Sequence, residues 1–552
     1  MKKIGILAVS MLLSAVGVSA ASNERGIDLY RAELFDAAKI EFLGQTGGTP
    51  TEQAERYYYL GQTYSELQKP DSSAYYYAQA VSIDPNYPFG YIGQGELELS
   101  KGNLKAAEDL FKQANGLAKK DPSVQTSIAE SYIEYDKNTE AEAALVKARK
   151  ADKKFPGLYV AEGDAIAKGG LSKVGEAAGS YEQALLFDPN YKIALLKLAR
   201  IYKTVNPSES LKYLDQLVSL DPNYIPAYAL IGDINRSLGQ YNKALDAYQK
   251  FIAIPGVPTQ QREYYAQLLY FTDQYDKSLE EIKLVLAQYP NNVVMHRLQA
   301  YNDYKLGNYA AANAEMTQFL KDTPADQHIY LDYSTYSNIL LKEKQPEAAI
   351  AALQKALELA VDKDKAGVYR DLASAYESAK NYPAAIEHYQ KYFTTAENPG
   401  VLDYHWYGMA NYYAAAQYSD GTGDETEFQS YIDNGTKAFS EVIERSPESY
   451  LGYLTQAQLL SLVDAREQAV TKANTVKGAA RPAYEKALEV MLANNDGGKR
   501  NNEIIQAYSY LGSYYALADD KPNAGLYLKK ILEIDPSNEY AKSVLDSLKI
   551  KY

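Results

Sequence analysis

The sequence predicts an all-α fold, a solenoid of about 14 helix-turn-helix repeats that ends in a capping helix. Prolines recur at a nearly constant interval, the apolar residues between them follow helical spacing, and one proline-containing tetrapeptide appears several times. The chain has 552 residues, which is too long for one ordinary domain unless the domain is built from stacked units.

The prolines define the length of the repeat. Their intervals run from 33 to 37 residues between Pro50, Pro85, Pro122, Pro156, Pro189, Pro222, Pro255, Pro290 and Pro324. Proline lacks the amide donor that a continuing helix needs, so each is expected to mark the passage from one unit to the next. The tetrapeptide Asp-Pro-Asn-Tyr recurs at Asp84–Tyr87, Asp188–Tyr191 and Asp221–Tyr224, with a looser copy at residues 535–538.

Between the prolines, the apolar residues follow the i, i+3, i+4, i+7 spacing of amphipathic helices. The last unit shows this most clearly. A first helix is expected to present Tyr508, Leu511, Gly512 and Tyr515, and a second helix Ala524, Leu528 and Ile531. Gly512 and Ala524 are small where paired helices approach closely, because a larger side chain would separate the helices.

These positions resemble the tetratricopeptide repeat (TPR), whose pattern is Trp/Tyr-x2-Leu-Gly-x2-Tyr followed by Ala, Phe/Tyr, Ala and Pro on the second helix. One unit carries Tyr57, Leu60, Gly61, Tyr64, Tyr77, Ala80 and Pro85, and a later one carries Tyr369, Leu372, Ala373, Tyr376, Ala385 and Tyr389. The only tryptophan, Trp406, is placed at the Trp position of its unit. The resemblance covers nearly the whole chain after residue 20 and implies a right-handed superhelix.

Three stretches depart from the repeat pattern. Polar residues are added at Gln417–Asn434, a unit is lengthened at Ser461–Pro482, and a small insertion with three glycines lies at Ala165–Gly175. The sequence leaves open whether these stretches are loops or longer helices. Residues 538–551 are expected to form the final helix, because a solenoid must cover its last apolar face.

Residues 1–20 have the pattern of a secretory signal peptide. Lys2 and Lys3 precede a short apolar run, and Val18-Ser19-Ala20 suits signal peptidase. We therefore expect an exported, soluble protein, periplasmic or extracellular, whose mature chain has no transmembrane segment. No cysteine follows the run, so no lipid anchor is expected. The expected organisation is a signal peptide at 1–20, N-terminal and central repeats at 21–400, and C-terminal repeats with polar insertions and the cap at 401–552.

The composition excludes several kinds of chemistry. The formal net charge is −14, which argues against a partner such as nucleic acid. The chain has no cysteine, and its four histidines have no ligand-pair spacing: His296, His328, His388 and His405. Asp420–Asp424 resembles a calcium loop only faintly, since the alternating oxygen ligands are missing. We expect no enzyme, no metal and no cofactor.

The TPR resemblance implies that first helices line a concave groove, at positions 1, 5 and 8 residues after the Tyr/Trp position. For the units near residues 259–411, these positions are Tyr270, Arg297, Tyr301, Tyr304, Asn338 and Arg370, and an earlier phase of the Trp406 unit adds Tyr407 and Asn411. Some TPR domains hold a partner's C-terminal carboxylate with Lys, Arg and Asn at such sites.

The expected function is a non-enzymatic protein-interaction scaffold of the bacterial cell envelope, which binds a peptide segment or protein partner in the groove. The chain contains 53 tyrosines, and a flat ring with a polar tip can also grip sugars. A glycan- or small-ligand-binding envelope protein that uses groove tyrosines is therefore the alternative.

Overall fold

The computed structural model describes residues 22–472, 476–493 and 498–552. The predicted signal peptide lies outside the described residues. Within them the chain forms 29 α-helices and two short 3-10 helices, Leu171–Lys173 and Ala325–Gln327, and no strand. The predicted all-α repeat solenoid is confirmed.

The chain divides into two compact units between Asn302 and Asp303. The division falls inside one helix, and the polar stretches at residues 417–434 and 461–482 lie within the second unit. Unit 1 contains α1 (Glu24–Arg31), α2 (Phe35–Gly44), α3 (Pro50–Glu66), α4 (Pro70–Ile83), α5 (Pro88–Ser100), α6 (Leu104–Leu117), α7 (Pro122–Glu134), α8 (Asn138–Ala151), α9 (Pro156–Ala167), α10 (Val174–Phe187), α11 (Lys192–Val205), α12 (Pro207–Leu220), α13 (Ile225–Ser237), α14 (Tyr241–Ile252), α15 (Thr259–Phe271), α16 (Tyr275–Gln288) and most of α17 (Val293–Leu306).

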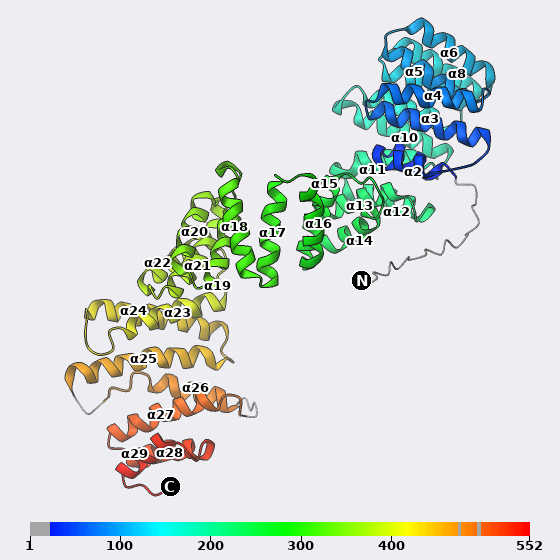
Figure 1. Ribbon diagram of the computed structural model, residues 1–552. Coiled ribbons are helices and arrows are strands. Elements are labelled where there is room, and N and C mark those ends of the chain that lie inside the picture. The colour runs from blue at the N-terminus through cyan, green and yellow to red at the C-terminus, as the bar shows by residue number, and fades with distance from the viewer. Residues whose placement is uncertain (1–21, 473–475, 494–497) are drawn as a thin grey trace, which may run out of the picture. The chain divides into compact units, whose positions relative to one another are not determined.

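Unit 2 is a stack of helices in which successive layers follow the chain (Figure 1). Its elements after α17 are α18 (Tyr309–Asp322), α19 (Tyr330–Lys342), α20 (Pro346–Leu359), α21 (Asp362–Ser378), α22 (Tyr382–Thr395), α23 (Val401–Ala416), α24 (Glu425–Arg445), α25 (Tyr450–Thr471), α26 (Arg481–Ala493), α27 (Asn501–Leu517), α28 (Lys521–Ile534) and α29 (Glu539–Ser547). The last helix contacts α28 and covers the end of the stack, as the sequence predicted.

Close helix contacts recur at small residues, and they fix the phase of the repeats. A Cβ atom added to Gly61 would lie 2.4 Å from the ring of Tyr77, and one added to Gly95 would lie 2.3 Å from Phe111. Gly512 stands in the same relation to Leu528, at 2.9 Å. In each case the two residues are 16 positions apart. Equivalent positions therefore join the first and second helix within each of these repeats. The predicted role of Gly512 agrees with this geometry.

The recurring Asp-Pro-Asn-Tyr sequence forms the turn between repeats. The carboxylate of Asp84 accepts a hydrogen bond from the amide of Asn86 at 3.0 Å, and Asp221 accepts one from Asn223 at 2.9 Å. This is the Asx-turn geometry, in which a short carboxylate satisfies an amide two residues further along the chain. The Tyr that follows, as at Tyr224, is then buried between helices.

The phase of the Trp406 unit differs from the prediction. The close contact in α23 lies at Gly408, where an added Cβ would be 2.5 Å from Phe439. Gly408 lies two residues before Ala410, which the sequence pattern assigned to this close contact. Trp406 consequently turns outward and is 50% exposed, with its ring against His405.

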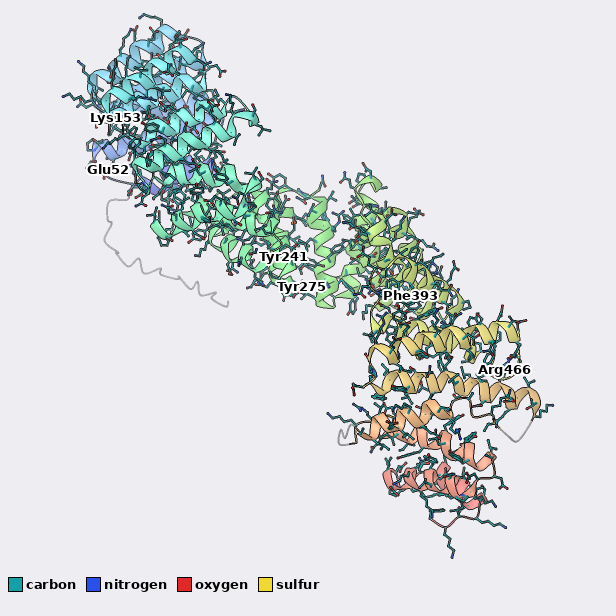
Figure 2. The ribbon with its side chains drawn as sticks, turned by 180° about the vertical axis from the view of Figure 1, so that it is seen from behind. Glu52, Lys153, Tyr241, Tyr275, Phe393 and Arg466 are labelled. Carbon is teal, nitrogen blue, oxygen red and sulfur yellow. The ribbon has the colours of Figure 1, made fainter. Side chains whose placement is uncertain are left out.

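The insertions resolve into loops and longer helices. Residues 417–424 form turns, after which α24 begins and runs for 21 residues; the second stretch extends α25 to 22 residues. The buried guanidinium of Arg466, labelled in Figure 2, donates to the carbonyl oxygens of Tyr418 at 2.5 Å and Thr422 at 2.6 Å and pairs with Glu425 at 2.7 Å. An arginine therefore supplies the positive charge inside the loop that faintly resembled a calcium site.

Candidate functional site

The first repeat of unit 1 closes the superhelix on itself. Helix α1 contacts its neighbour α3 and also α13, which belongs to the repeat six further along the chain. Leu29 and Phe42 share one apolar cluster with Tyr248 and Phe251, and α2 is drawn beside α11 and α13 in Figure 1. We call helices α1 to α14 the closed turn.

Charged residues hold this closure. The ammonium of Lys192 on α11 lies 2.9 Å from Glu24, 3.2 Å from Asp28 and 3.1 Å from Asp221. On the same helix, Arg200 pairs with Glu33 and donates to the carbonyl oxygen of Ala32 at 2.8 Å. Apart from Asp221, which lies in the turn between α12 and α13, these partners belong to the first repeat. The first repeat is therefore anchored by both apolar and ionic contacts.

The first helices of the repeats lie on the inside of the closed turn, because α3, α5, α7 and α9 contact one another in succession. Each of them carries one polar side chain directly after its small contact residue. These four side chains form what we call the inner row: Gln62, Glu96, Glu130 and Asp164, at a constant interval of 34 residues.

Hydrogen bonds connect the inner row from α1 to α7. The Tyr30 hydroxyl donates to Gln62 at 3.0 Å, and Gln62 donates to Glu96 at 2.6 Å. The other carboxylate oxygen of Glu96 accepts from the hydroxyl of Ser131 at 2.7 Å. At the far end, Asp164 accepts from Tyr181 at 2.6 Å and pairs with Lys197 at 2.9 Å.

The interior of the closed turn raises the pKa of two carboxyl groups of the inner row, those of Glu96 and Glu130. Desolvation raises the pKa of Glu96 to about 7, against the effect of the donors Ser131, Gln62 and Tyr77. Desolvation and the nearby charge of Asp164 also raise the pKa of Glu130 to about 7, while Arg31 and Lys197 act in the opposite direction. Glu130 on α7 and Arg31 on α1 therefore influence each other inside the closed turn.

Glu130 is the member of the inner row that remains available. Its side chain is exposed, and within residues 22–472, 476–493 and 498–552 its carboxylate makes no hydrogen bond or ion pair. A carboxylate in such a partly desolvated interior favours a cationic partner group. The described part of the chain holds no cluster of side chains suited to a metal ion, and none of its helices has the length and hydrophobicity needed to cross a bilayer.

The residues of the inner row were not among the predicted groove residues, although the sequence pattern used for the groove also identifies two of them. The position five residues after Tyr57 is Gln62, and the position five residues after Tyr91 is Glu96. The groove rule therefore finds both residues. The prediction, which was limited to the units near residues 259–411, did not include them.

The structure brings some of the predicted groove residues together. Tyr270 on α15 and Tyr301 on α17 place their rings 6.3 Å apart, and both are half-buried. Arg297 lies one turn before Tyr301 on the same helix and is also half-buried. These three residues belong to unit 1. Tyr304 falls in unit 2, where its ring packs 6.0 Å from that of Tyr309.

The remaining predicted residues lie in unit 2 in different environments. Arg370 is exposed, with its guanidinium 3.9 Å from Asp403, and Asn338 is half-buried. Tyr407 packs against the preceding second helix, where its ring lies 5.4 Å from Phe393. Asn411 has no exposed surface and donates to the backbone of its own helix, so its side chain does not line an open surface.

Comparison with known proteins points to one repeat family. Models described as the tetratricopeptide repeat match residues 54–87, 225–255 and 337–400. The chain is 23% identical over 347 residues to the protein CTR9 homolog of Arabidopsis thaliana; the match covers 61% of this chain and 28% of that protein.

Solved structures that match the chain include the C-terminal part of a TPR repeat-containing protein from Cytophaga hutchinsonii, with 26% identity, TM-score 0.41 and coverage of 51% of this chain and 99% of that chain. The Cut9–Hcn1 hetero-tetramer structure is 12% identical with TM-score 0.30, and the match covers 93% of this chain and 98% of that chain.

Proposed function

Because the chain is a tetratricopeptide repeat protein, we propose that it is a non-enzymatic scaffold that binds a segment of a partner protein along the inner surface of its repeats. We place this scaffold in the bacterial cell envelope. The charged and apolar pattern of residues 1–20 supports export. The repeated helix pairs supply a long surface on which one extended segment can touch several repeats.

The unpaired carboxylate of Glu130 carries the proposal for the closed turn. It lies in a row with Glu96 and Asp164, in a chain whose formal net charge is −14. A partner segment that carries lysine or arginine would supply the missing positive charge. We therefore propose a basic segment as the ligand of the inner row.

A second contact surface is proposed on the predicted groove residues that are half-buried or exposed and do not pack against the preceding second helix as Tyr407 does. In unit 1 these are Tyr270, Arg297 and Tyr301; in unit 2 they are Tyr304, Asn338 and Arg370. Flat aromatic rings and guanidinium groups are the side chains that most often anchor a binding partner. Each set is a separate surface on its own unit.

The experiment uses fluorescein-labelled hexalysine and the full chain, followed by fluorescence anisotropy. The Glu130 carboxyl has a pKa of about 7, so it becomes ionised between pH 6 and pH 8. We expect the affinity for hexalysine to rise by up to about tenfold over this range. The variant Glu130→Gln is expected to bind more weakly at pH 8 and to lose most of the pH dependence.

The matched control is Glu142→Gln, which removes an exposed carboxylate from α8 in the same unit. This variant is expected to bind like the wild type. Equal binding of hexalysine by the wild type and Glu130→Gln at pH 8 would contradict the proposal. Oligosaccharides that quench tyrosine fluorescence, with no binding of hexalysine, would favour the glycan alternative.

A further inference from the structure

Unit 1 carries a basic hollow that the proposed function does not use. It has a volume of about 580 Å³ and is lined by Asn115, Lys119, Lys120, Gln125, Lys147 and Lys150. We call it the lysine hollow. Its lining carries four positive charges and no carboxylate, in a chain of formal net charge −14.

The fold places these lysines around one space. Lys119 and Lys120 lie in the turn between α6 and α7, and Lys147 and Lys150 lie three residues apart near the end of α8. Gln125 on α7 forms the floor, with 3% of its surface exposed, and its amide donates to Asn115 on α6. Three helices and one turn therefore fix the shape of the hollow.

None of the four lysines is neutralised within the part of the chain that the structure describes. On the same helix α6, by contrast, Lys105 lies 3.2 Å and Lys112 lies 3.3 Å from Asp109. Lysines near the C-terminal ends of α6 and α8 interact favourably with the helix dipoles. The dipoles alone do not explain why four lysines line the same hollow. Lys153, labelled in Figure 2 and exposed, adds a further positive charge after α8.

We propose that the lysine hollow binds a short, carboxylate-rich segment of a partner protein. Its volume is in the range of clefts that hold small ligands, so it accepts a few residues and not a folded domain. A long polyanion, such as an anionic membrane surface, would also be repelled by the net negative charge of the rest of the chain. A short acidic segment would contact the lysines alone.

This site is separate from the inner row. The inner row lies on first helices, whereas the hollow is formed by the second helices α6 and α8 with the start of α7. The two sites also favour opposite charges. Failure of one proposal therefore leaves the other in place.

The test uses fluorescein-labelled hexaglutamate and the full chain. We expect the wild type to bind hexaglutamate, with an affinity that falls as salt is added. Lys119→Ala combined with Lys150→Ala removes one charge from each side of the hollow and is expected to weaken binding about five- to tenfold. Thermal melting of the variant shows whether the fold is retained.

Lys243→Ala combined with Lys283→Ala is the matched control. Both lysines are exposed in unit 1, and neither forms an ion pair among the described residues, so the change in net charge is identical. Binding at wild-type affinity by this control supports the proposal. Equal affinity of the hollow variant and the wild type would overturn it, and so would lysine-dependent binding of phosphatidylglycerol vesicles without binding of hexaglutamate.

Discussion

The ammonium nitrogen of Lys192 lies 3.2 Å from the carboxylate of Asp28, although 164 residues separate them in the chain. Most contacts in a repeat solenoid join neighbouring units. This ion pair instead joins the first repeat to the sixth, and Asp28 is only 9% exposed. Closure of the superhelix in unit 1 therefore rests partly on charged contacts between residues far apart in the chain.

Lys192→Met is expected to loosen the first repeat. The variant leaves Asp28 without its cation in a mostly buried position, at a cost of about 1–3 kcal/mol. Hydrogen exchange should show faster exchange in α1 and α2 and little change in α7 and α8. Lys212→Met, which removes an exposed lysine paired with Glu209, should leave both regions unchanged. Protection of α1 equal to that of the wild type would show that the apolar contacts alone hold the repeat.

Glu96→Gln is expected to stabilise the chain at high pH only. Desolvation raises the pKa of Glu96 to about 7 in the folded state, against about 4.3 in an unfolded chain. The folded state keeps this proton longer, so the free energy of unfolding falls as pH rises from about 4.3 to 7. The variant removes this loss and should gain about 1–3 kcal/mol at pH 8.

At pH 4 the Glu96→Gln variant and the wild type should unfold at the same urea concentration. Glu98→Gln, on the same helix, is the control. Hydrogen bonds from Lys101 and Asn103 lower the pKa of Glu98, so this variant should lower the free energy of unfolding at pH 8 instead of raising it. A gain for Glu96→Gln that does not depend on pH would show that desolvation is not its cause.

Gly61→Ala should destabilise unit 1 while Gly116→Ala should stabilise it. The added methyl at Gly61 would meet the ring of Tyr77 at 2.4 Å, and overpacking of this kind costs about 1–3 kcal/mol. Gly116 lies in α6 with nothing within 4 Å of an added Cβ, so the gain in helix propensity of about 0.5–1 kcal/mol is realised. Thermal melting of both variants measures the difference; equal shifts would contradict the phase of the repeats.

The regular part of this architecture could be predicted from local signals. Proline spacing, the Asx turn at Asp84 and the small residue at Gly61 each act within one or two repeats, so the sequence pattern contains the whole physical cause. Trp406 was placed wrongly because Gly408 and Ala410 both fit a close helix contact. The pattern could not show that Phe439 comes 31 residues after Gly408, because the inserted loop lengthens this unit.

The candidate site was less accessible to prediction, because it depends on closure. Glu96 and Glu130 occupy ordinary groove positions, and it is desolvation inside the closed turn that raises their pKa values. Closure brings Asp28 next to Lys192, 164 residues away in the chain, and a contact at this separation cannot be predicted from a local sequence pattern. The lysine hollow was missed for a related reason, since it combines a turn and the end of a helix from adjacent repeats.

Arg466→Lys is expected to release the turn at residues 417–424. The guanidinium is 5% exposed and donates to three carbonyl oxygens while pairing with Glu425. A lysine ammonium cannot reproduce this planar set of donors. Limited proteolysis should then cut the turn faster than in the wild type, with a loss of stability of about 2–4 kcal/mol. Unchanged cleavage would mean that the backbone turns hold without the arginine.

The contact between the first repeat and α11 also sets an order of events during synthesis. Translation adds about 5–20 residues per second, so the ribosome needs roughly 10–30 s to pass from Asp28 to Lys192. Throughout that interval α1 and α2 can pack against α3, but their apolar residues lack the partners that α13 and α14 supply. The pair α1 and α2 therefore completes its packing late, and a nascent chain halted before α11 would present these incompletely packed apolar residues to chaperones and proteases.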